Sequence, residues 1–353
     1  MKLSVISFTE RGMLLSKTVR NVLLDTLEDI ALFTKCSRCH DETVPFVTEG
    51  LSSWAGGQMQ KGNAILFIGA CGIAVRAVAP HLVSKLEDSP VLVLDEGGQY
   101  VIPLVAGHIG GGNALARLLA DHLRAQPVIT TATDLRGAFA VDLFAKQNHL
   151  SIGEKGGIAK VSSKVLSGQA ITMAMEPGHL DEKHPVPREV RLVPYPPKGM
   201  VDVLITTQTI PVQASLRLYP KIYVVGMGCK RGTSEETLRK FYLQTLKQHN
   251  IARESVMCLC SIAQKKDEMG LCGLCARERL PFVTYSAETL RRVEGDFHGS
   301  DFVKQQVGVD NVCERAAKKK AGDTGVLVVP KQRDNGMTIA VVKTEWRVQF
   351  DTE

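Results

Sequence analysis

The stretch at residues 64–82, AILFIGACGIAVRAVAPHL, decides the fold. Residues 64–69 form a continuous apolar run with the length of a buried strand, and the run ends in a glycine. Residues 72–82 then have a helical pattern that stops near Pro80. A buried strand followed directly by a helix is the repeating unit of parallel sheets.

The same alternation continues on both sides of this stretch. Further strands are predicted at 2–8, 90–96, 100–105 and 127–130, with helices over 12–30, from 110 onward and over 137–148. After a proline-rich segment, strands are predicted at 221–225, 256–262, 282–285, 326–329 and 337–342, with helices over 234–249, 267–278, 300–308 and 312–320. Asn335-Gly336 favours a hairpin between the last two strands. The pattern predicts mostly parallel sheets flanked by helices.

Proline content marks the domain organisation. Eight of the fifteen prolines lie between Pro177 and Pro220. We therefore predict a multi-domain α/β protein with an N-terminal α/β domain over 1–150, a small proline-rich α/β middle domain or connector over 151–218, and a separate α/β C-terminal domain over 219–353.

Composition excludes several classes of protein. The chain has 353 residues, of which 44% are hydrophobic and 23% charged, which is typical of a globular protein. The longest apolar stretch, residues 64–75, is shorter than the roughly 18 residues that cross a bilayer. The first residues lack a signal-peptide pattern, and nine cysteines are an odd number. We expect a cytoplasmic protein with no membrane segment.

The net charge of +6 is unevenly distributed. Residues 1–150 carry a net charge of −1, residues 151–218 carry +2 and residues 219–353 carry +5. The basic last third suits a nucleic acid, a phosphate ligand or a polycarboxylate, or is a solvated face. Aromatic residues make up only 5%, and no basic run is interleaved with Phe or Tyr, so we expect no nucleic-acid partner.

Glycines and polar residues collect after four predicted strands of the first domain, at 69–72, 95–98, 107–113 and 130–134. In open parallel sheets, ligands bind at the carboxyl ends of strands, so we predict a binding site there. The candidate ligand contacts are Gly69, Gly72, Arg76, Gly107, Gly110, Gly111, Gly112, Asn113, Thr130 and Thr131.

The loop at 107–113, GHIGGGN, is the most informative of these ends. Successive glycines before a helix let a ligand approach the main chain, whose free N–H groups suit an anion or a developing oxyanion. The intrinsic pKa of a histidine side chain is near neutral, so His108 suits proton transfer. The alternative is a tight turn with a hydrogen-bonded histidine.

Other charged residues near these ends have two interpretations each. Asp95 and Glu96 supply a general base or cap the following turn. Asp134 is a base or a helix N-cap. Arg76 binds a substrate carboxylate or pairs with Glu87 or Asp88.

The loop at 226–232, GMGCKRG, follows a strand and precedes a helix. Its glycine spacing resembles a dinucleotide-binding loop only weakly, because the next strand ends in residues 261–266, which place no acid to hold a ribose hydroxyl. The candidate contacts here are Gly228, Lys230, Arg231 and Lys266.

Cysteine spacing suggests metal chemistry, which other features disfavour. Residues 36–40 match the pattern of covalent haem attachment, which requires export. Cys258, Cys260, Cys272 and Cys275 form two pairs, but the second pair lies in a predicted helix. Buried free thiols are the preferred interpretation, and we expect no protein-bound metal.

Taken together, these motifs resemble the CbiG family. The segments that carry the resemblance are 69–76, 95–97, 106–113, 128–134, 226–234, 261–271, 300–317 and Lys331. They cover nearly the whole chain in the family's order.

The resemblance implies a cobalt-precorrin-5A hydrolase of anaerobic cobalamin biosynthesis. Such an enzyme opens a δ-lactone on a cobalt-bound tetrapyrrole and releases a two-carbon unit as acetaldehyde, which gives cobalt-precorrin-5B. The resemblance implies no cofactor, because the substrate carries the cobalt. His108, Glu96 or Asp134 then activates water, and Arg76, Lys230, Arg231 and Lys266 anchor substrate carboxylates.

Two other hypotheses stay open on the residues alone. An NADP-linked reductase would use the loop at 226–232, and a carrier would bind the tetrapyrrole without chemistry. Transfer of intermediates from other enzymes of the pathway and a homodimer are further hypotheses.

Overall fold

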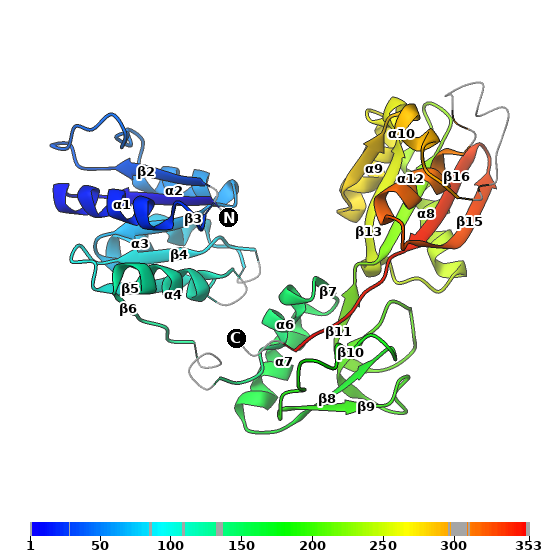
Figure 1. The fold of residues 1–353 in the computed structure, drawn as a ribbon, viewed down its shortest axis with the longest axis horizontal. Helices are drawn as coiled ribbons and strands as arrows, with labels where there is room; N and C mark the ends of the chain where they lie inside the picture. Colours follow the sequence, from blue (N-terminus) through cyan, green and yellow to red (C-terminus); the bar gives the residue numbers. More distant parts are fainter. Residues whose placement is uncertain are drawn as a thin grey trace. The chain divides into compact units, whose positions relative to one another are not determined.

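The computed structural model describes residues 2–27, 29–84, 87–107, 110–131, 137–295, 297, 309 and 311–350. Its contacts divide the chain into two units, Met1–Ala138 and Phe139–Glu353. The first unit contains one sheet and the second contains two (Figure 1). The chain is therefore α/β in every part, as the sequence predicts, while its division into three domains stays a prediction.

The first sheet has the strand order β2-β1-β3-β4-β5-β6. Its strands are β1 Lys2–Ser7, β2 Asp29–Thr34, β3 Ala64–Ile68, β4 Val91–Leu94, β5 Tyr100–Val105 and β6 Gln126–Pro127. Its helices are α1 Glu10–Leu23, α2 Leu51–Gln60, α3 Cys71–Val78 and α4 Gly112–Leu123, with a short 3₁₀ turn, η1, at Ala79–His81. β3 and β4 are fully buried, as their unbroken apolar sequences require.

Helices cover both faces of this sheet. Apolar residues of α1 and α4 pack on one face, and those of α2 and α3 pack on the other. Trp54 of α2 lies edge-on to Phe33 and Phe67 of the sheet. The two cores fix β1, β3 and β4 as the rigid centre of the unit.

Two features of this sheet differ from the sequence prediction. The helix predicted over 12–30 ends at Leu23, and β2 begins at Asp29. α2 was not predicted, because Gly56 and Gly57 weaken its helical pattern. Gly56 is nevertheless suited to its place, since a Cβ there would lie 2.5 Å from the ring of His81.

The direction of β5 is the feature that matters most for function. β1 to β4 are parallel, but β5 runs antiparallel to β4, and β6 is parallel to β5. The residues that follow β5 and β6 therefore lie at the opposite edge of the sheet from those that follow β3 and β4. The four glycine-rich strand ends are therefore divided between two edges, whereas an all-parallel sheet would place them at one.

The second sheet has the order β7-β11-β10-β8-β9. Its elements are α6 Val141–Gln147, β7 Leu150–Ile152, α7 Lys155–Leu166, β8 Ile171–Met175, β9 Val190–Val193, β10 Val201–Ile205 and β11 Ala214–Pro220. β8 to β11 are mutually parallel, and only β7 is antiparallel. The proline-rich region therefore has a sheet of its own.

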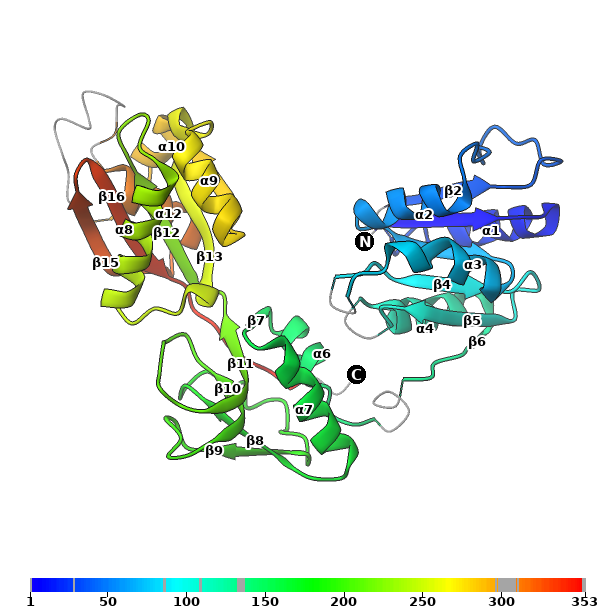
Figure 2. The same ribbon diagram turned by 180° about the vertical axis from the view of Figure 1, so that it is seen from behind.

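The third sheet has the order β14-β13-β12-β16-β15. Its strands are β12 Tyr223–Gly228, β13 Val256–Ile262, β14 Phe282–Tyr285, β15 Val326–Asp334 and β16 Met337–Lys343. Its helices are α8 Glu235–Gln248, α9 Met269–Glu278, α10 Ala287–Arg291 and α12 Val312–Ala321, with 3₁₀ turns η2 Arg253–Ser255 and η3 Ala263–Lys265. α12 covers one face, while α8 and α9 cover the other (Figures 1 and 2). The helix predicted over 300–308 falls outside the described residues.

The predicted hairpin is confirmed between β15 and β16. Asn335 and Gly336 both have positive φ, 45° and 81°, as a tight hairpin turn requires. Gly228 pairs with the residue that follows Met337, so this turn lies at the carboxyl end of β12.

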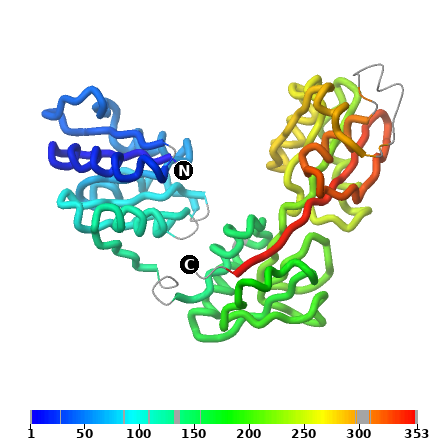
Figure 3. The backbone as a smooth tube through the Cα atoms, in the orientation of Figure 1, coloured from blue at the N-terminus to red at the C-terminus, as the bar shows by residue number. Residues whose placement is uncertain are grey.

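The C-terminal segment ties the last two sheets together. After β16 it returns to the second sheet, where Val348 bridges Leu180 and Trp346 stacks on His179 at 4.0 Å (Figure 3). Phe350 then packs against Phe139 and Phe144. These contacts explain why the two sheets form one compact unit.

Candidate functional site

One edge of the first sheet carries Gly69, Gly72, Arg76 and Glu96. Gly69 ends β3 and donates its N–H to Leu94 at 2.9 Å, which ties the ends of β3 and β4 together. Arg76 is exposed on α3, and a Cβ on Gly72 would lie 3.5 Å from its guanidinium. The Arg76 side chain therefore folds back over the first turn of its own helix, where an anion would also be favoured.

The two acids at this edge have different environments. Asp95 accepts hydrogen bonds from the backbone N–H groups of Gly97, Gln99 and Tyr100 at 2.9, 2.7 and 2.6 Å. Of the two interpretations of Asp95, turn capping is the one that these contacts support. Glu96 accepts a hydrogen bond from the hydroxyl of Thr9, the residue that caps α1.

Arg76 has no salt-bridge partner among the residues that the structure describes. The carboxylate of Asp88 instead accepts hydrogen bonds from the backbone N–H groups of Val83 and Ser84. The pairing of Arg76 with Asp88 that the sequence left open is therefore not observed, and the guanidinium faces solvent.

The opposite edge carries the loop from Gly107 to Asn113 together with Thr130 and Thr131. Asn113 is only 3% exposed, and its Nδ2 donates to Thr131 Oγ1 at 3.0 Å. The loop after β5 and the segment after β6 are therefore held against each other. Gly69, Gly72, Arg76 and Glu96 lie at the far edge and do not join them.

The glycines of this loop are required by its own packing. The N–H groups of Gly112 and Asn113 donate to the carbonyl oxygens of Ala106 and Gly107 at 3.1 and 2.7 Å. A Cβ on Gly110 would lie 2.5 Å from the Ala106 carbonyl oxygen, and Gly111 has a φ of 89°. Two N–H groups at the start of α4 are thus already engaged, which reduces what the turn offers to an oxyanion.

His108 and Asp134 lie outside the described residues. Their described sequence neighbours Gly107, Gly110 and Thr131 all lie at the edge that carries Asn113. Their roles therefore stay predictions.

The third sheet brings its candidate residues to one edge. Gly228 is the last residue of β12, and the loop that follows carries Lys230 and Arg231. The turn η3, after the neighbouring parallel strand β13, precedes Lys266. Lys230, Arg231 and Lys266 are exposed. The result is a basic edge that suits carboxylates or phosphates.

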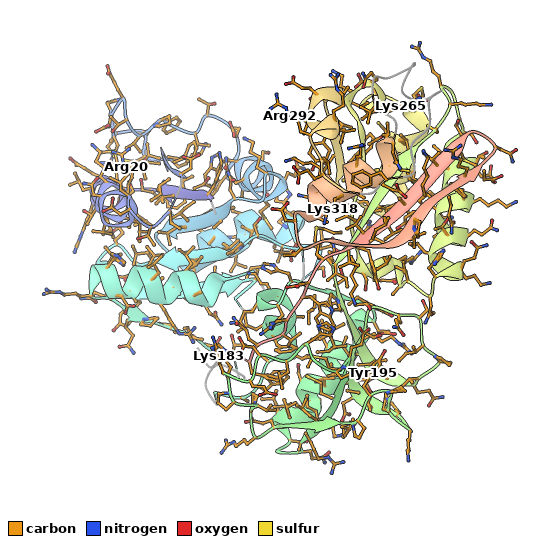
Figure 4. The ribbon with its side chains drawn as sticks, turned by 45° about the vertical axis from the view of Figure 1, so that its right-hand side comes forward. Arg20, Lys183, Tyr195, Lys265, Arg292 and Lys318 are labelled. Atoms are coloured by element: carbon orange, nitrogen blue, oxygen red, sulfur yellow. The ribbon has the colours of Figure 1, made fainter. Side chains whose placement is uncertain are left out.

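Contacts of the half-buried Glu268 organise this basic edge. Glu268 accepts a hydrogen bond from Gly232 N–H at 2.8 Å and pairs with Lys265 at 2.7 Å. These two donors, Lys265 first, lower the pKa of Glu268. Figure 4 shows Lys265 at this part of the third sheet. The stem of Lys230 lies across Gly336, so a Cβ there would approach its Cε to 2.5 Å.

The glycine that suggested a dinucleotide loop has a structural explanation. A Cβ on Gly226 would overlap the carbonyl oxygen of Cys313, the second residue of α12. The glycine therefore admits a helix to the sheet rather than a pyrophosphate.

The cysteine pairs show no metal geometry. The sulfurs of Cys258 and Cys260 are buried 3.8 Å apart on β13, and burial raises the pKa of Cys275 to about 12. Across the described parts of the chain, no three His, Cys, Asp or Glu side chains gather as metal ligands. Within the same parts, no helix is both long and apolar enough to span a membrane.

Three sheets flanked by helices define a multi-domain α/β protein. Family models described as Cobalamin synthesis G N-terminal and Cobalamin synthesis G C-terminus match residues 53–134 and 223–342. The chain belongs to this family, CbiG.

Individual relatives extend over most of the chain. A cobalt-precorrin-5A hydrolase of Salmonella typhimurium is 32% identical over 348 residues, which are 96% of this chain and 97% of that protein. A protein of the same name from Priestia megaterium is 34% identical over 295 residues, 79% of this chain and 78% of the relative. A crystal structure of a cobalamin biosynthesis protein G homolog from Sulfolobus solfataricus aligns with a TM-score of 0.39 and 19% identity, covering 98% and 97% of the two chains.

Proposed function

We propose that this protein hydrolyses cobalt-precorrin-5A in cobalamin biosynthesis. The observation that carries the proposal is the 32% identity to the Salmonella typhimurium hydrolase across 96% of the chain. Water opens the δ-lactone of the macrocycle, and the two-carbon unit then leaves as acetaldehyde to give cobalt-precorrin-5B. The cobalt arrives as part of the substrate, and the proposal includes no resident cofactor.

Lactone opening needs a base that activates water and donors that stabilise the oxyanion. His108 and Asp134 are the proposed bases in the segment that contains Asn113 and Thr131. Glu96 is the alternative at the other edge, where the hydroxyl of Thr9 holds its carboxylate. A base at Glu96 would act through the oxygen that Thr9 leaves free.

The substrate carries many carboxylates, so cationic side chains are its proposed anchors. Arg76 at one edge of the first sheet and Lys230, Arg231 and Lys266 at the edge of the third are all exposed. A hydrogen bond between opposite charges contributes about 1.5–3 kcal/mol, so one anchor changes affinity by roughly an order of magnitude or more.

Anoxic incubation of the purified protein with cobalt-precorrin-5A tests the proposal. We expect acetaldehyde, measured with alcohol dehydrogenase and NADH, together with a corrinoid of the mass of cobalt-precorrin-5B. Macrocycle binding without acetaldehyde would support a carrier instead. Saturable NADPH binding, followed by fluorescence, would support a reductase.

His108→Asn then tests the first-choice base. We expect turnover to fall about 10²–10⁴-fold while substrate binding is retained. Turnover near the wild-type rate would remove His108 from the chemistry and leave Asp134 and Glu96.

A cytoplasmic location, direct hand-over of the macrocycle between enzymes and a homodimer also belong to this proposal. The hand-over is supported by the place of the reaction within a series of steps on one macrocycle, and the homodimer is a separate hypothesis. Light scattering on the purified protein distinguishes a dimer from a monomer.

A further inference from the structure

The second sheet contains a buried carboxylate that the proposed lactone chemistry does not use. Glu176 directly follows β8 and is 8% exposed. Its Oε1 accepts three hydrogen bonds, from Thr206 Oγ1 at 3.0 Å, Thr207 N–H at 2.6 Å and Thr207 Oγ1 at 2.9 Å. Three donors on one oxygen hold the carboxylate in one orientation.

The donors are themselves held by tyrosines. The Thr206 hydroxyl donates its hydrogen bond to Glu176. Its oxygen therefore accepts a hydrogen bond from the Tyr195 hydroxyl at 2.9 Å. Figure 4 shows Tyr195 in the second sheet's region of the chain. On the other side, the Tyr223 hydroxyl donates to Thr207 Oγ1 at 3.4 Å. Burial raises the pKa of both tyrosines, which keeps both hydroxyls protonated as donors.

The position of this network is that of a ligand site. β10, β8 and β9 are adjacent and parallel, and Thr206, Glu176 and Tyr195 all follow their carboxyl ends. This is the edge at which open parallel sheets bind ligands. The sequence between residues 151 and 218 gave no sign of a site because its prolines resemble those of a connector.

The second oxygen of Glu176 decides what the site accepts. Within the part of the chain that the structure describes, Oε2 receives no hydrogen bond, whereas Oε1 receives three. An ionised carboxylate repels the peripheral carboxylates of a precorrin, so Oε2 suits a group that donates a proton. The lactone itself offers no such group, but opening it frees an alcohol on the carbon that leaves as acetaldehyde.

We propose that Glu176 is the catalytic base of the second step, in which the ring-opened alcohol releases acetaldehyde. Oε2 takes the hydroxyl proton, and the C–O bond becomes the C=O of acetaldehyde. The bond from that carbon to the macrocycle breaks, and its electron pair stays on the macrocycle, which takes up a proton. The step is redox-neutral, and it rests on the proposed hydrolase function.

Glu176→Gln separates the two steps, because the amide preserves shape but does not accept the proton. We expect the lactone to open at close to the wild-type rate, while acetaldehyde release falls about 10²–10⁴-fold. Mass spectrometry should then find a species heavier than the substrate by one water. Glu182→Gln, an exposed carboxamide substitution in the same region, should behave like the wild type.

Chemical rescue separates catalysis from a structural role. In Glu176→Ala, added formate should restore a large part of acetaldehyde release, whereas a merely structural carboxylate would not be replaced by a free ion. The proposal is overturned if Glu176→Gln releases acetaldehyde normally, if it blocks lactone opening instead, or if formate restores nothing. A wild-type protein that leaves the lactone intact would overturn the hydrolase function itself, which is a distinguishable result.

Discussion

The two glycine-rich loops of this protein look alike in sequence and serve different packing needs. The loop at 106–113 follows β5 and folds on itself, with Ala106 and Gly107 accepting N–H groups from Gly112 and Asn113. The motif at 226–234 begins within β12, and its first glycine, Gly226, admits α12 to the sheet. A glycine in a strand-end motif thus indicates that another group packs close to the backbone. It does not indicate whether that group belongs to a ligand, a loop or a helix.

The strongest test of this comparison is Gly226→Ala. The new Cβ would overlap the Cys313 carbonyl oxygen, and both groups are buried backbone that has little room to move. We expect the free energy of unfolding, measured with urea, to fall by about 3 kcal/mol. Gly156→Ala is the matched control, since its Cβ enters open space on α7 and should stabilise by about 0.5–1 kcal/mol.

Gly110→Ala makes the same change in the first loop. Its Cβ would press on Ala106, but Gly110 is only half-buried and the contact lies within one loop. We therefore expect a smaller loss of about 1–2 kcal/mol in the urea unfolding free energy. Gly57→Ala, with open space around its Cβ, is the control. A loss as large as that of Gly226→Ala would mean that the two loops are equally fixed.

The sequence predicts most strands of this fold because their apolar runs are long and unbroken, as in β3 and β13. It does not predict β5's direction, since a strand's residues carry no record of whether its neighbour is parallel. Because β5 runs antiparallel to β4, Glu96 and the Asn113 loop lie at opposite edges of the sheet. α2 escapes prediction because Gly56 is needed for contact with His81, a tertiary demand.

The candidate sites divide in the same way. Motif spacing predicts the basic edge of the third sheet, where Lys230 and Lys266 follow neighbouring parallel strands. It misses Glu176, whose partners Thr206 and Thr207 lie 30 and 31 residues away. Only strand order shows that β8 and β10 are neighbours.

Cationic anchors sharpen the comparison at the level of binding. We expect Arg76→Ala and Arg231→Ala each to raise KM by roughly tenfold with kcat little changed, because each removes a charge-assisted contact worth about 1.5 kcal/mol. If only one of the two variants raises KM, the edge that carries that arginine is the one that binds the substrate carboxylates. Lys183→Ala, at an exposed position of the second sheet's region, is the control (Figure 4). If KM is unchanged in both variants, neither arginine binds substrate, and the basic edge is better interpreted as a solvated face.

The smallest expected effect concerns the contacts of Glu268 that hold the loop after β12 in place. Lys265 and the Gly232 N–H lower the pKa of Glu268 below its ordinary value of 4.5. A carboxyl with a lowered folded-state pKa stabilises the fold above its unfolded-state pKa, and this contribution disappears as pH falls through the folded-state pKa. Glu268→Gln should therefore lose about 1 kcal/mol of unfolding free energy at neutral pH. The difference in unfolding free energy between Glu268→Gln and the wild type should become smaller as pH falls below 4.5. A gap that persists in acid would show that Glu268 fastens the loop by shape and neutral hydrogen bonds, as the first loop is fastened by its own carbonyls.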